Sequence, residues 1–377
     1  MGKKRKYNDM SEKKAANIIA PKLAYQPPKP RRYNPPIGLI GCGGISGSHL
    51  PAYREMGLNI VALCDLIPER AESRRKEFFP EARVYTDYKE LLQRDDIEVV
   101  DIATHPQDRE YLIPAALKAR KHVLSQKPFV LDLDKGERFA ELAEKMGVTL
   151  AVNQNGRWAP HWSWVRHAIG KGLIGEVSTV HLNCHWSHEW IADTHFNRVH
   201  HIVFYDYGIH WFDALASFMQ GRKSGRVIAN LGYAKGQRAK PPLLGQALIE
   251  FDTGHASLVF DGATKFGAKD DGFILGNKGT LRYDGPGLTD HVVELMTARG
   301  RAVPELTGQW FRQGFMGSMG ELLSAIEQKR MPVNNPLDNL RGLSICFAAV
   351  VSSETGKPQI AGKVRKAPLK TCMVAAK

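Results

Sequence analysis

The sequence predicts an α/β protein in which a domain with a parallel sheet precedes an α+β domain with a mainly antiparallel sheet. Two observations support this prediction. From Ile37 onward, short apolar runs alternate with helical segments, an order typical of a parallel sheet with right-handed crossovers. After about Trp158, alternating strands flank the turn sequences Asp252-Thr-Gly-His255 and Gly276-Asn-Lys-Gly279, which favour hairpins. The length of 377 residues agrees with two domains.

The expected elements follow from the apolar period and the flanking turn residues. In the first half we expect strands at Ile37–Ile40, Asn59–Cys64, Val99–Ala103, His122–Ser125 and Thr149–Val152. Between them we expect helices at about Ser46–Met56, Pro68–Phe79, Arg109–Ala119 and Leu133–Met146. In the second half we expect strands at Val177–Trp186, Ala247–Phe251, Ala256–Phe260, Phe273–Leu275 and Thr280–Tyr283, and helices at Met316–Gln328 and Pro336–Ser353.

Four segments are predicted along the chain. Residues 1–36 form a basic, proline-rich arm, residues 37–157 the first domain, residues 158–362 the second domain and residues 363–377 a tail. A helix near the C-terminus is expected to return toward the first domain. The arm holds ten basic and two acidic residues, so it carries +8 of the net charge of +13. Charge concentrated in a terminal segment is typical of a solvated tail, so we expect no nucleic-acid partner.

The apolar pattern and the cysteines indicate the compartment. No apolar run approaches the length needed to span a bilayer, and no apolar stretch follows the basic N-terminus. The five cysteines are scattered and include no C-x-x-C pair, so a disulfide framework is not expected. We therefore predict a cytoplasmic protein with reduced thiols and no membrane contact.

A glycine loop, Gly41-Cys-Gly43-Gly44-Ile45-Ser46, follows the first strand and begins the first helix. Gly41, Gly43 and Gly44 allow a tight turn and close approach to a pyrophosphate, which the amides at the helix N-terminus then face. Asp65 follows the second strand, where a carboxylate binds ribose hydroxyls and repels a 2′-phosphate. The context predicts a Rossmann domain that prefers NAD to NADP, although arginines after Asp65 weaken that preference.

Two further motifs carry groups suited to proton transfer. Lys127, in Ser125-Gln-Lys-Pro128, ends a strand of the parallel sheet, where ligands of such sheets bind. Asp206 and His210 are four residues apart and would share one face of an α-helix. A His–carboxylate pair transfers protons well, because the carboxylate fixes the tautomer of the imidazole. For Asp206 and His210 alone, a capping aspartate and a buried histidine are the stronger interpretation.

The order of these motifs resembles the glucose–fructose oxidoreductase, inositol dehydrogenase and MocA (Gfo/Idh/MocA) family over about residues 37–362. The glycine loop, Gln126-Lys-Pro128, Asn155-Gly-Arg157, Asp206-x-Gly-x-His210 and the helix at Gly320–Ile326 occur in the family's order. The resemblance implies an open-faced antiparallel sheet in the second domain and Lys127, Asp206 and His210 as catalytic residues. It implies that the cofactor contacts the glycine loop from Gly41 through Gly43, Gly44 and Ile45 to Ser46, together with Asp65, Thr104, His105, Gln126, Lys127, Asn155, Arg157 and Trp158. The usual Glu is replaced by Gln126, and bulkier residues at 200–205 precede Asp206.

Histidines and tryptophans crowd into residues 181–201. His185-x-x-His188 suggests a metal, but no Cys or carboxylate completes a site at a fixed spacing, so no metal is predicted. Trp186 and Trp190 offer flat apolar faces for a sugar ring, and His188 a hydrogen bond. The alternative, in which these residues belong to the core and to a dimer interface, is equally compatible with the pattern.

The combined motifs predict an enzyme that oxidises a secondary alcohol of a sugar, polyol or glycoside by hydride transfer to nicotinamide. The predicted substrate-binding residues are Lys127, Trp186, His188, Asp206 and His210. One alternative is a glycoside hydrolase that keeps NAD bound and uses transient ring oxidation, and another is a non-catalytic sensor. We also expect a homo-oligomer, a dimer or tetramer, formed through the sheet domain, with the arm over a neighbouring subunit.

Overall fold

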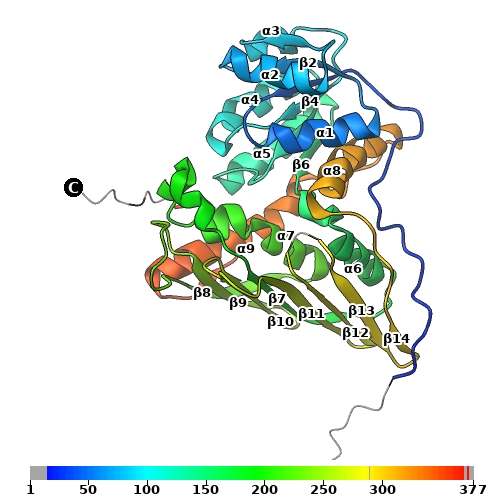
Figure 1. The fold of residues 1–377 in the computed structure, drawn as a ribbon, viewed down its shortest axis with the longest axis vertical. Coiled ribbons are helices and arrows are strands. Elements are labelled where there is room, and N and C mark those ends of the chain that lie inside the picture. Colours follow the sequence, from blue (N-terminus) through cyan, green and yellow to red (C-terminus); the bar gives the residue numbers. More distant parts are fainter. Residues whose placement is uncertain (1–14, 288, 369–371, 373–377) are drawn as a thin grey trace, which may run out of the picture.

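The computed structural model describes residues 15–287, 289–368 and 372. Figure 1 shows two sheets, one above the other, with helices between and around them. The first sheet has six parallel strands in the order β3-β2-β1-β4-β5-β6. Its strands are β1 Ile37–Ile40, β2 Ile60–Cys64, β3 Arg83–Tyr85, β4 Val99–Ile102, β5 His122–Gln126 and β6 Leu150–Asn153. The expected parallel sheet is thus confirmed, and its strand order reverses between β1 and β4, where Rossmann folds bind their ligand.

Helices cover both faces of this sheet, which explains why β1, β4 and β6 are buried along their whole length. The helices are α1 Ser46–Met56, α2 Pro68–Phe78, α3 Tyr88–Leu92, α4 Pro106–Lys118 and α5 Leu133–Met146. Strand β3 and helix α3 were not predicted from the sequence. A three-residue strand and a five-residue helix are too short to show an apolar period. Helix α4 begins three residues earlier than expected, because Pro106 takes its first turn.

The second sheet is mixed, with nine strands in the order β14-β13-β12-β11-β7-β10-β9-β8-β15. Its strands are β7 Val177–His185, β8 Ser224–Gly232, β9 Leu244–Phe251, β10 His255–Asp261, β11 Lys269–Gly276, β12 Gly279–Gly285, β13 Val292–Thr297, β14 Gly300–Ala302 and β15 Gln359–Ile360. Neighbours pair antiparallel except β7 and β10, which are parallel. Both predicted hairpins, β9–β10 and β11–β12, are present.

Helices lie on one face of the second sheet and leave the other face open (Figure 1). They are α6 Pro160–Gly170, α7 Ile209–Phe218 and α9 Pro336–Thr355, whereas α8 Trp310–Glu327 packs against α1 of the first domain. Phe315, Met319 and Leu322 of α8 share a buried cluster with the first-domain strands. The expected return of a C-terminal helix toward the first domain is therefore seen in α8. None of the described helices is long and apolar enough to cross a membrane.

The described part of the arm, residues 15–36, lies along its own chain (Figure 1). Its start pairs with β14, where the Ile18 N–H donates to the Arg301 carbonyl at 2.8 Å. Farther along, the backbone N–H groups of Arg31, Arg32 and Tyr33 donate to the Glu327 carboxylate at 2.7–3.0 Å. The expectation that this segment covers a neighbouring subunit is corrected, because it closes the edge of its own sheet and the end of α8. Most of the predicted basic tail, residues 1–14, lies outside the described residues.

Candidate active site

The glycine loop joins β1 to α1 in a conformation that leaves room for a ligand. Gly41 has φ of +100°, and a Cβ there would lie 2.9 Å from the Ala103 carbonyl carbon. A side chain is therefore excluded at this turn. A Cβ at Gly43 or Gly44 would meet no atom within 4 Å, so the loop presents bare backbone to open space beside the N-terminus of α1. This arrangement fits a pyrophosphate.

Asp65 follows β2 and is held against the glycine loop. Its Oδ2 accepts the Cys42 N–H at 2.7 Å, and its Oδ1 accepts the Ile67 N–H at 2.9 Å. Arg74 approaches the same loop, donating to Ser46 Oγ at 3.1 Å. The carboxylate and the guanidinium thus flank the place where an adenosine ribose would lie, and they have opposite effects on a 2′-phosphate.

Thr104 and His105 follow β4 at the same edge of the sheet. Thr104 Oγ1 is buried and has no hydrogen-bond partner among the described residues. Such an unpaired hydroxyl is consistent with a ligand that would complete its hydrogen bonding. The His105 ring contacts His195 of the segment His195–Arg198, with ring centroids 5.0 Å apart. His195, one of the histidines crowded into residues 181–201, had no predicted role and extends toward the first domain from the second.

Lys127 directly follows β5, and a buried arginine holds the backbone around it. The guanidinium of Arg109 donates to the carbonyls of Gln126 and Pro128, and none of its surface is exposed. Burial lowers the pKa of Arg109 to about 10, so it remains charged. Arg109 therefore supports the turn that carries Lys127, a role that no sequence motif signals.

The Lys127 ammonium pairs with Asp206 across the two domains. Its Nζ lies 3.2 Å from Asp206 Oδ1 and donates to the Asp206 carbonyl at 3.0 Å. Asp206 belongs to a π-helical turn, Val203–Tyr207, that precedes α7. No hydrogen bond or ion pair joins Asp206 to His210 in the described part of the chain, and their pairing stays a prediction. The π-helical turn places the Asp206 carboxylate beside the Lys127 ammonium.

His210 lies in the first turn of α7, and its ring contacts Trp310 at 5.3 Å between centroids. Its Nδ1 is buried and has no hydrogen-bond partner in the described part of the chain. Burial and the nearby Lys127 ammonium hold the pKa of His210 well below the usual range. The imidazole is thus neutral near pH 7, with a ring nitrogen free for a ligand. Trp310, at the start of α8, was missed by the sequence analysis.

Trp186 and His188 lie beyond the end of β7, beside this group. His188 stacks on Tyr207 with ring centroids 4.1 Å apart, and burial is the main cause that lowers its pKa to about 4. The Trp186 ring lies 5.9 Å from Trp310. His185 points elsewhere, because its Nδ1 contacts Asp261 at 2.7 Å. The structure therefore separates His185 from His188.

Residues 155–158 mainly join the domains together. Arg157 is buried, and its guanidinium binds the Asp213 carboxylate with two contacts of 2.6 Å and Asp338 at 2.7 Å. The expectation that Arg157 contacts the cofactor is corrected, since its donors are used inside the protein. Asn155 Oδ1 accepts the Trp310 N–H at 2.9 Å, and Trp158 is buried against α8.

Gln126 belongs to a buried network that the sequence analysis did not foresee. Its Oε1 accepts the Lys127 N–H at 2.6 Å, and its Nε2 lies 3.1 Å from His49 Nε2. His49 Nδ1 lies 2.6 Å from Asp101 Oδ2, which also accepts the Tyr53 hydroxyl at 2.6 Å. The imidazole thus donates to a carboxylate on one side and accepts an amide N–H on the other. The Gln126 side chain therefore connects this buried network to the backbone N–H of Lys127.

Comparisons with known proteins agree with this architecture. Residues 36–154 match an oxidoreductase family with an NAD-binding Rossmann fold, and residues 162–282 match the GFO/IDH/MocA C-terminal domain. The chain is 38% identical to D-apiose dehydrogenase of Paraburkholderia graminis over 138 residues, 36% of this chain and 36% of that protein. It is 30% identical to inositol 2-dehydrogenase of Salmonella typhimurium over 147 residues, 38% of this chain and 44% of that protein. The matched part thus spans less than half the length of either relative.

Solved structures resemble the chain over most of its length. An oxidoreductase from Agrobacterium radiobacter, in complex with NAD+, L-tartaric acid and magnesium, has a TM-score of 0.78 at 21% identity, covering 87% of this chain and 99% of that one. Scyllo-inositol dehydrogenase from Lactobacillus casei, with NAD(H) and scyllo-inositol, has a TM-score of 0.73 at 20% identity, covering 88% and 100%. At these identities the likeness shows the fold.

Proposed function

The chain belongs to the GFO/IDH/MocA oxidoreductase family, and from this premise we propose that it oxidises a secondary alcohol of a sugar, polyol or glycoside with NAD as hydride acceptor. One observation carries the proposal. The Lys127–Asp206 pair lies at the carboxyl end of β5, beside the buried His210 nitrogen that has no partner among the described residues. A cation and a neutral imidazole side by side can hold an alcohol oxygen and take its proton.

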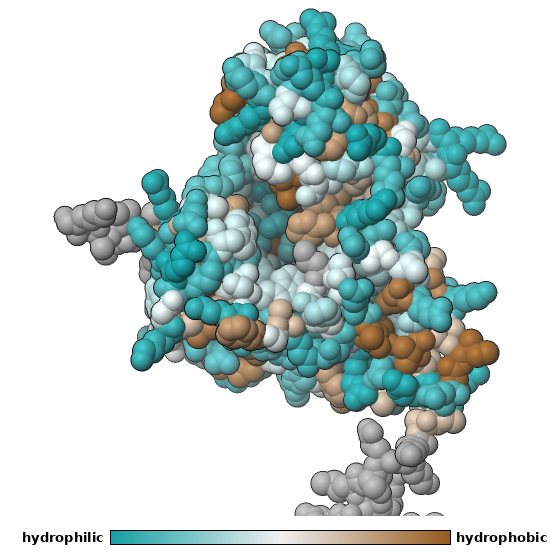
Figure 2. All heavy atoms as spheres, in the orientation of Figure 1, coloured by the Kyte–Doolittle hydropathy of each residue, from teal (hydrophilic) through white to brown (hydrophobic). Residues whose placement is uncertain are grey.

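The first domain supplies the groups that would hold the dinucleotide. The bare backbone at Gly43 and Gly44 and the N-terminus of α1 suit the pyrophosphate, and the unpaired Thr104 hydroxyl lies at the same sheet edge. Asp65 favours NAD over NADP, because its carboxylate would repel a 2′-phosphate. When bound, the nicotinamide supplies the carbon that accepts the hydride. Figure 2 shows that the surface is hollowed where the two domains meet.

The side chains around the alcohol have separate tasks in this proposal. The Lys127 ammonium donates a hydrogen bond to the alcohol oxygen and stabilises the negative charge that develops there. His210 is neutral at physiological pH and accepts the alcohol proton. Asp206 balances the charge of Lys127, from a distance of 3.2 Å, and keeps the ammonium at the domain boundary. The proposed orienting role of Asp206 toward His210 is thereby replaced by a role toward Lys127.

The walls of the site suit a ring with several hydroxyl groups. The half-buried Trp186 provides an aromatic face and His188 a polar edge, and the buried rings of Tyr207 and Trp310 pack against them. Flat apolar faces combined with a few polar groups bind carbohydrate rings through their C–H faces and hydroxyls. The substrate class is therefore proposed as a sugar, a polyol or a glycoside.

The test uses the full chain, NAD, and a panel of polyols, free sugars and nitrophenyl glycosides, with NADH formation and nitrophenol release scored separately. We expect NADH formation, and a fall in turnover of about 100-fold or more in Lys127→Ala and His210→Ala. Lys135→Ala is the matched control, since it removes a lysine paired with Glu110 on the surface of the first domain. Nitrophenol release without net NADH would instead show a hydrolase that retains NAD, and normal turnover in His210→Ala would remove its role as base.

The open face of the second sheet supports the proposal of a homo-oligomer. Leu248 is 60% exposed and Ile228 44%, on the neighbouring strands β9 and β8, and Phe273 on β11 is 39% exposed. Apolar side chains gathered on a sheet face commonly mark a protein interface. Light scattering would measure the mass, and Leu248→Lys should lower it, whereas a monomeric wild-type chain would contradict the proposal.

The described cysteines are all free and buried, which supports a reducing, cytoplasmic location.

A further inference from the structure

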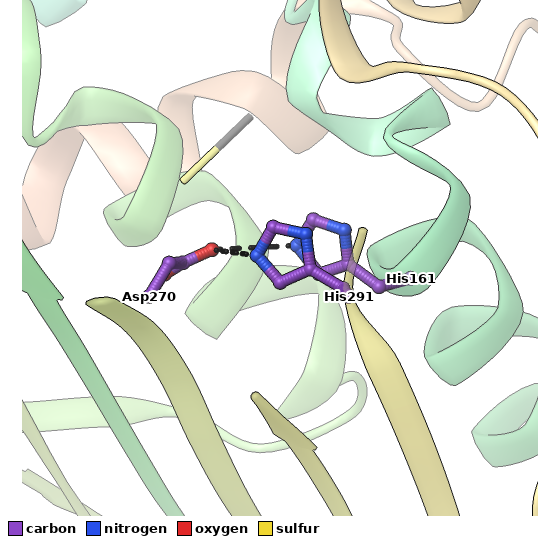
Figure 3. Close-up of side chains that lie close together, drawn as sticks. All are labelled: His161, Asp270 and His291. Carbon is purple, nitrogen blue, oxygen red and sulfur yellow. Dashed lines mark hydrogen bonds and ion pairs between the residues drawn. The ribbon is translucent and has the colours of Figure 1, made fainter. Parts of the chain in front are cut away.

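Three side chains far apart in the sequence meet in the second domain. They are His161 in the first turn of α6, Asp270 in β11 and His291 just before β13 (Figure 3). His291 Nε2 lies 3.0 Å and His161 Nε2 lies 3.5 Å from the same oxygen, Asp270 Oδ2. One ligand atom from each of the three residues lies within 4.8 Å of the others.

The three groups are buried and oriented from outside. Their side chains are 1%, 0% and 3% exposed, respectively. The indole N–H of Trp211 donates to Asp270 Oδ1 at 3.0 Å, which turns Oδ2 toward the two imidazoles. His161 Nε2 is buried and makes no hydrogen bond with any described residue. A buried histidine nitrogen that faces a carboxylate and has no hydrogen-bond partner is typical of a metal site whose ion is absent.

Charge supports the same conclusion. Asp270 is fully buried; its Oδ2 lies 3.0 Å from His291 Nε2 and 3.5 Å from His161 Nε2, and its Oδ1 accepts the Trp211 N–H. Among the described residues Asp270 has no Lys or Arg partner. A buried anion surrounded by imidazoles is strongly stabilised by a divalent cation.

We propose that His161, Asp270 and His291 bind one divalent transition-metal ion, for which zinc is the best-matched candidate. A tetrahedral ion bound at about 2.0–2.2 Å places neighbouring ligands about 3.3–3.6 Å apart. The 3.5 Å edge falls within this range, and the 3.0 Å edge lies slightly below it. Two nitrogens and one carboxylate oxygen form a donor set that zinc favours, with water as the fourth ligand.

The rings need a small movement to bind the ion. His161 and His291 are stacked 3.6 Å apart with 11° between their planes, so their lone pairs run parallel toward Asp270. Rotation of one ring would make them converge. A Cβ at Gly285 would lie 2.6 Å from the His291 ring, so glycine at this position is needed for the ring to occupy its place.

The ion would brace the wall of the proposed active site. It would join α6, β11 and the segment before β13, and Trp211, which donates to Asp270, adjoins His210 in α7. Trp310 lies between the two places, 6.4 Å from His161 and 5.3 Å from His210 between ring centroids. The ion is therefore structural in this inference, which does not depend on the proposed reaction.

The full chain, freed of metal with a chelator, would be titrated with zinc by calorimetry, and cobalt uptake would be followed by visible absorption. We expect one zinc per chain, a higher melting temperature with zinc, and a tetrahedral cobalt spectrum. Asp270→Asn retains the acceptor for Trp211 and should still fold, and His291→Gln removes one ligand. Each should weaken zinc binding by at least about 100-fold, since even outer-shell changes cost 10–100-fold.

His185→Gln is the matched control, because it removes a histidine that pairs with an aspartate, Asp261, outside the cluster. It should bind zinc as the wild type does. Two results would overturn the proposal. One is a wild-type chain that binds zinc no more tightly than Asp270→Asn does. The three side chains would then form a hydrogen-bonded His–Asp–His cluster that binds no metal. The other is zinc binding that is unchanged in both cluster variants.

Discussion

Replacing Asp101 with Asn tests whether the network behind Lys127 stabilises the fold and the site. Asp101 is fully buried, and its Oδ2 accepts two hydrogen bonds of 2.6 Å, from His49 and Tyr53. Bonds to a charged acceptor contribute about 1.5–3 kcal/mol and neutral ones about 0.5–1.5 kcal/mol, so losing the charge costs about 2 kcal/mol over the two bonds. The new amide would replace Oδ1, which has no hydrogen-bond partner among the described residues.

An unpaired buried amide adds about 1–3 kcal/mol, and the removal of a buried charge offsets part of the total. We therefore expect Asp101→Asn to lower the free energy of unfolding by about 2–3 kcal/mol. A neutral amide favours the Nδ1–H tautomer of His49 less strongly than the carboxylate does. His49 Nε2 is then less strongly held as the acceptor of the Gln126 side-chain N–H. Turnover should fall by less than the about 100-fold expected of Lys127→Ala, since Lys127 itself remains.

Urea unfolding of wild type, Asp101→Asn and a control would measure these free energies. Asp193→Asn is the control, since Asp193 pairs with Arg238 at the surface, where both side chains are more than half exposed. Such a pair contributes about 0–1 kcal/mol. An Asp101→Asn protein that unfolds like this control, with normal turnover, would show that the network has no part in stability or in holding Lys127.

Three further predictions follow from the geometry. Asp65→Ala should narrow the preference for NAD over NADP in a fluorescence titration, and a wild type that prefers NADP would show that Arg74 outweighs Asp65. Arg157→Met should cost about 3–5 kcal/mol of stability, because it leaves the Asp213 carboxylate buried without its cation; the NAD affinity of the remaining folded protein should stay unchanged, and a selective loss of affinity would return Arg157 to the cofactor site. Deletion of residues 1–36 should lower the melting temperature but leave the mass in light scattering unchanged, since the described arm binds its own chain; unchanged melting would make the arm dispensable.

Local sequence was sufficient for the Rossmann half. The glycine loop, α1 and Asp65 lie within about one strand–helix–strand unit, and their conformation depends on glycine, on the helix start and on buried strands that are adjacent in the sequence. The two hairpins of the second sheet were predictable for the same reason. Short elements such as β3 were not, because three residues carry no period and depend on the neighbouring strand.

The catalytic pairings depended on contacts that spacing does not encode. The four-residue interval between Asp206 and His210 predicts a pair, but the contacts seen among the described residues join Asp206 to Lys127 instead. The Asp206 carboxylate accepts a hydrogen bond from Lys127, which lies 79 residues earlier in the chain. Arg157 lies within a sequence motif, but its guanidinium binds the Asp213 carboxylate, because a buried cation requires a buried anion as its partner.

The fold class, the family and the residue types available for chemistry could all be read from the amino-acid sequence, since these follow from local periods and from motifs in order. Which of those residues are in contact depends on how segments distant in the sequence pack together. His161, Asp270 and His291 come from three separate elements, and no interval between them signals a cluster. Packing of α6 and α7 on the sheet excludes water from these polar groups, and buried polar groups must then bond to one another or to a ligand.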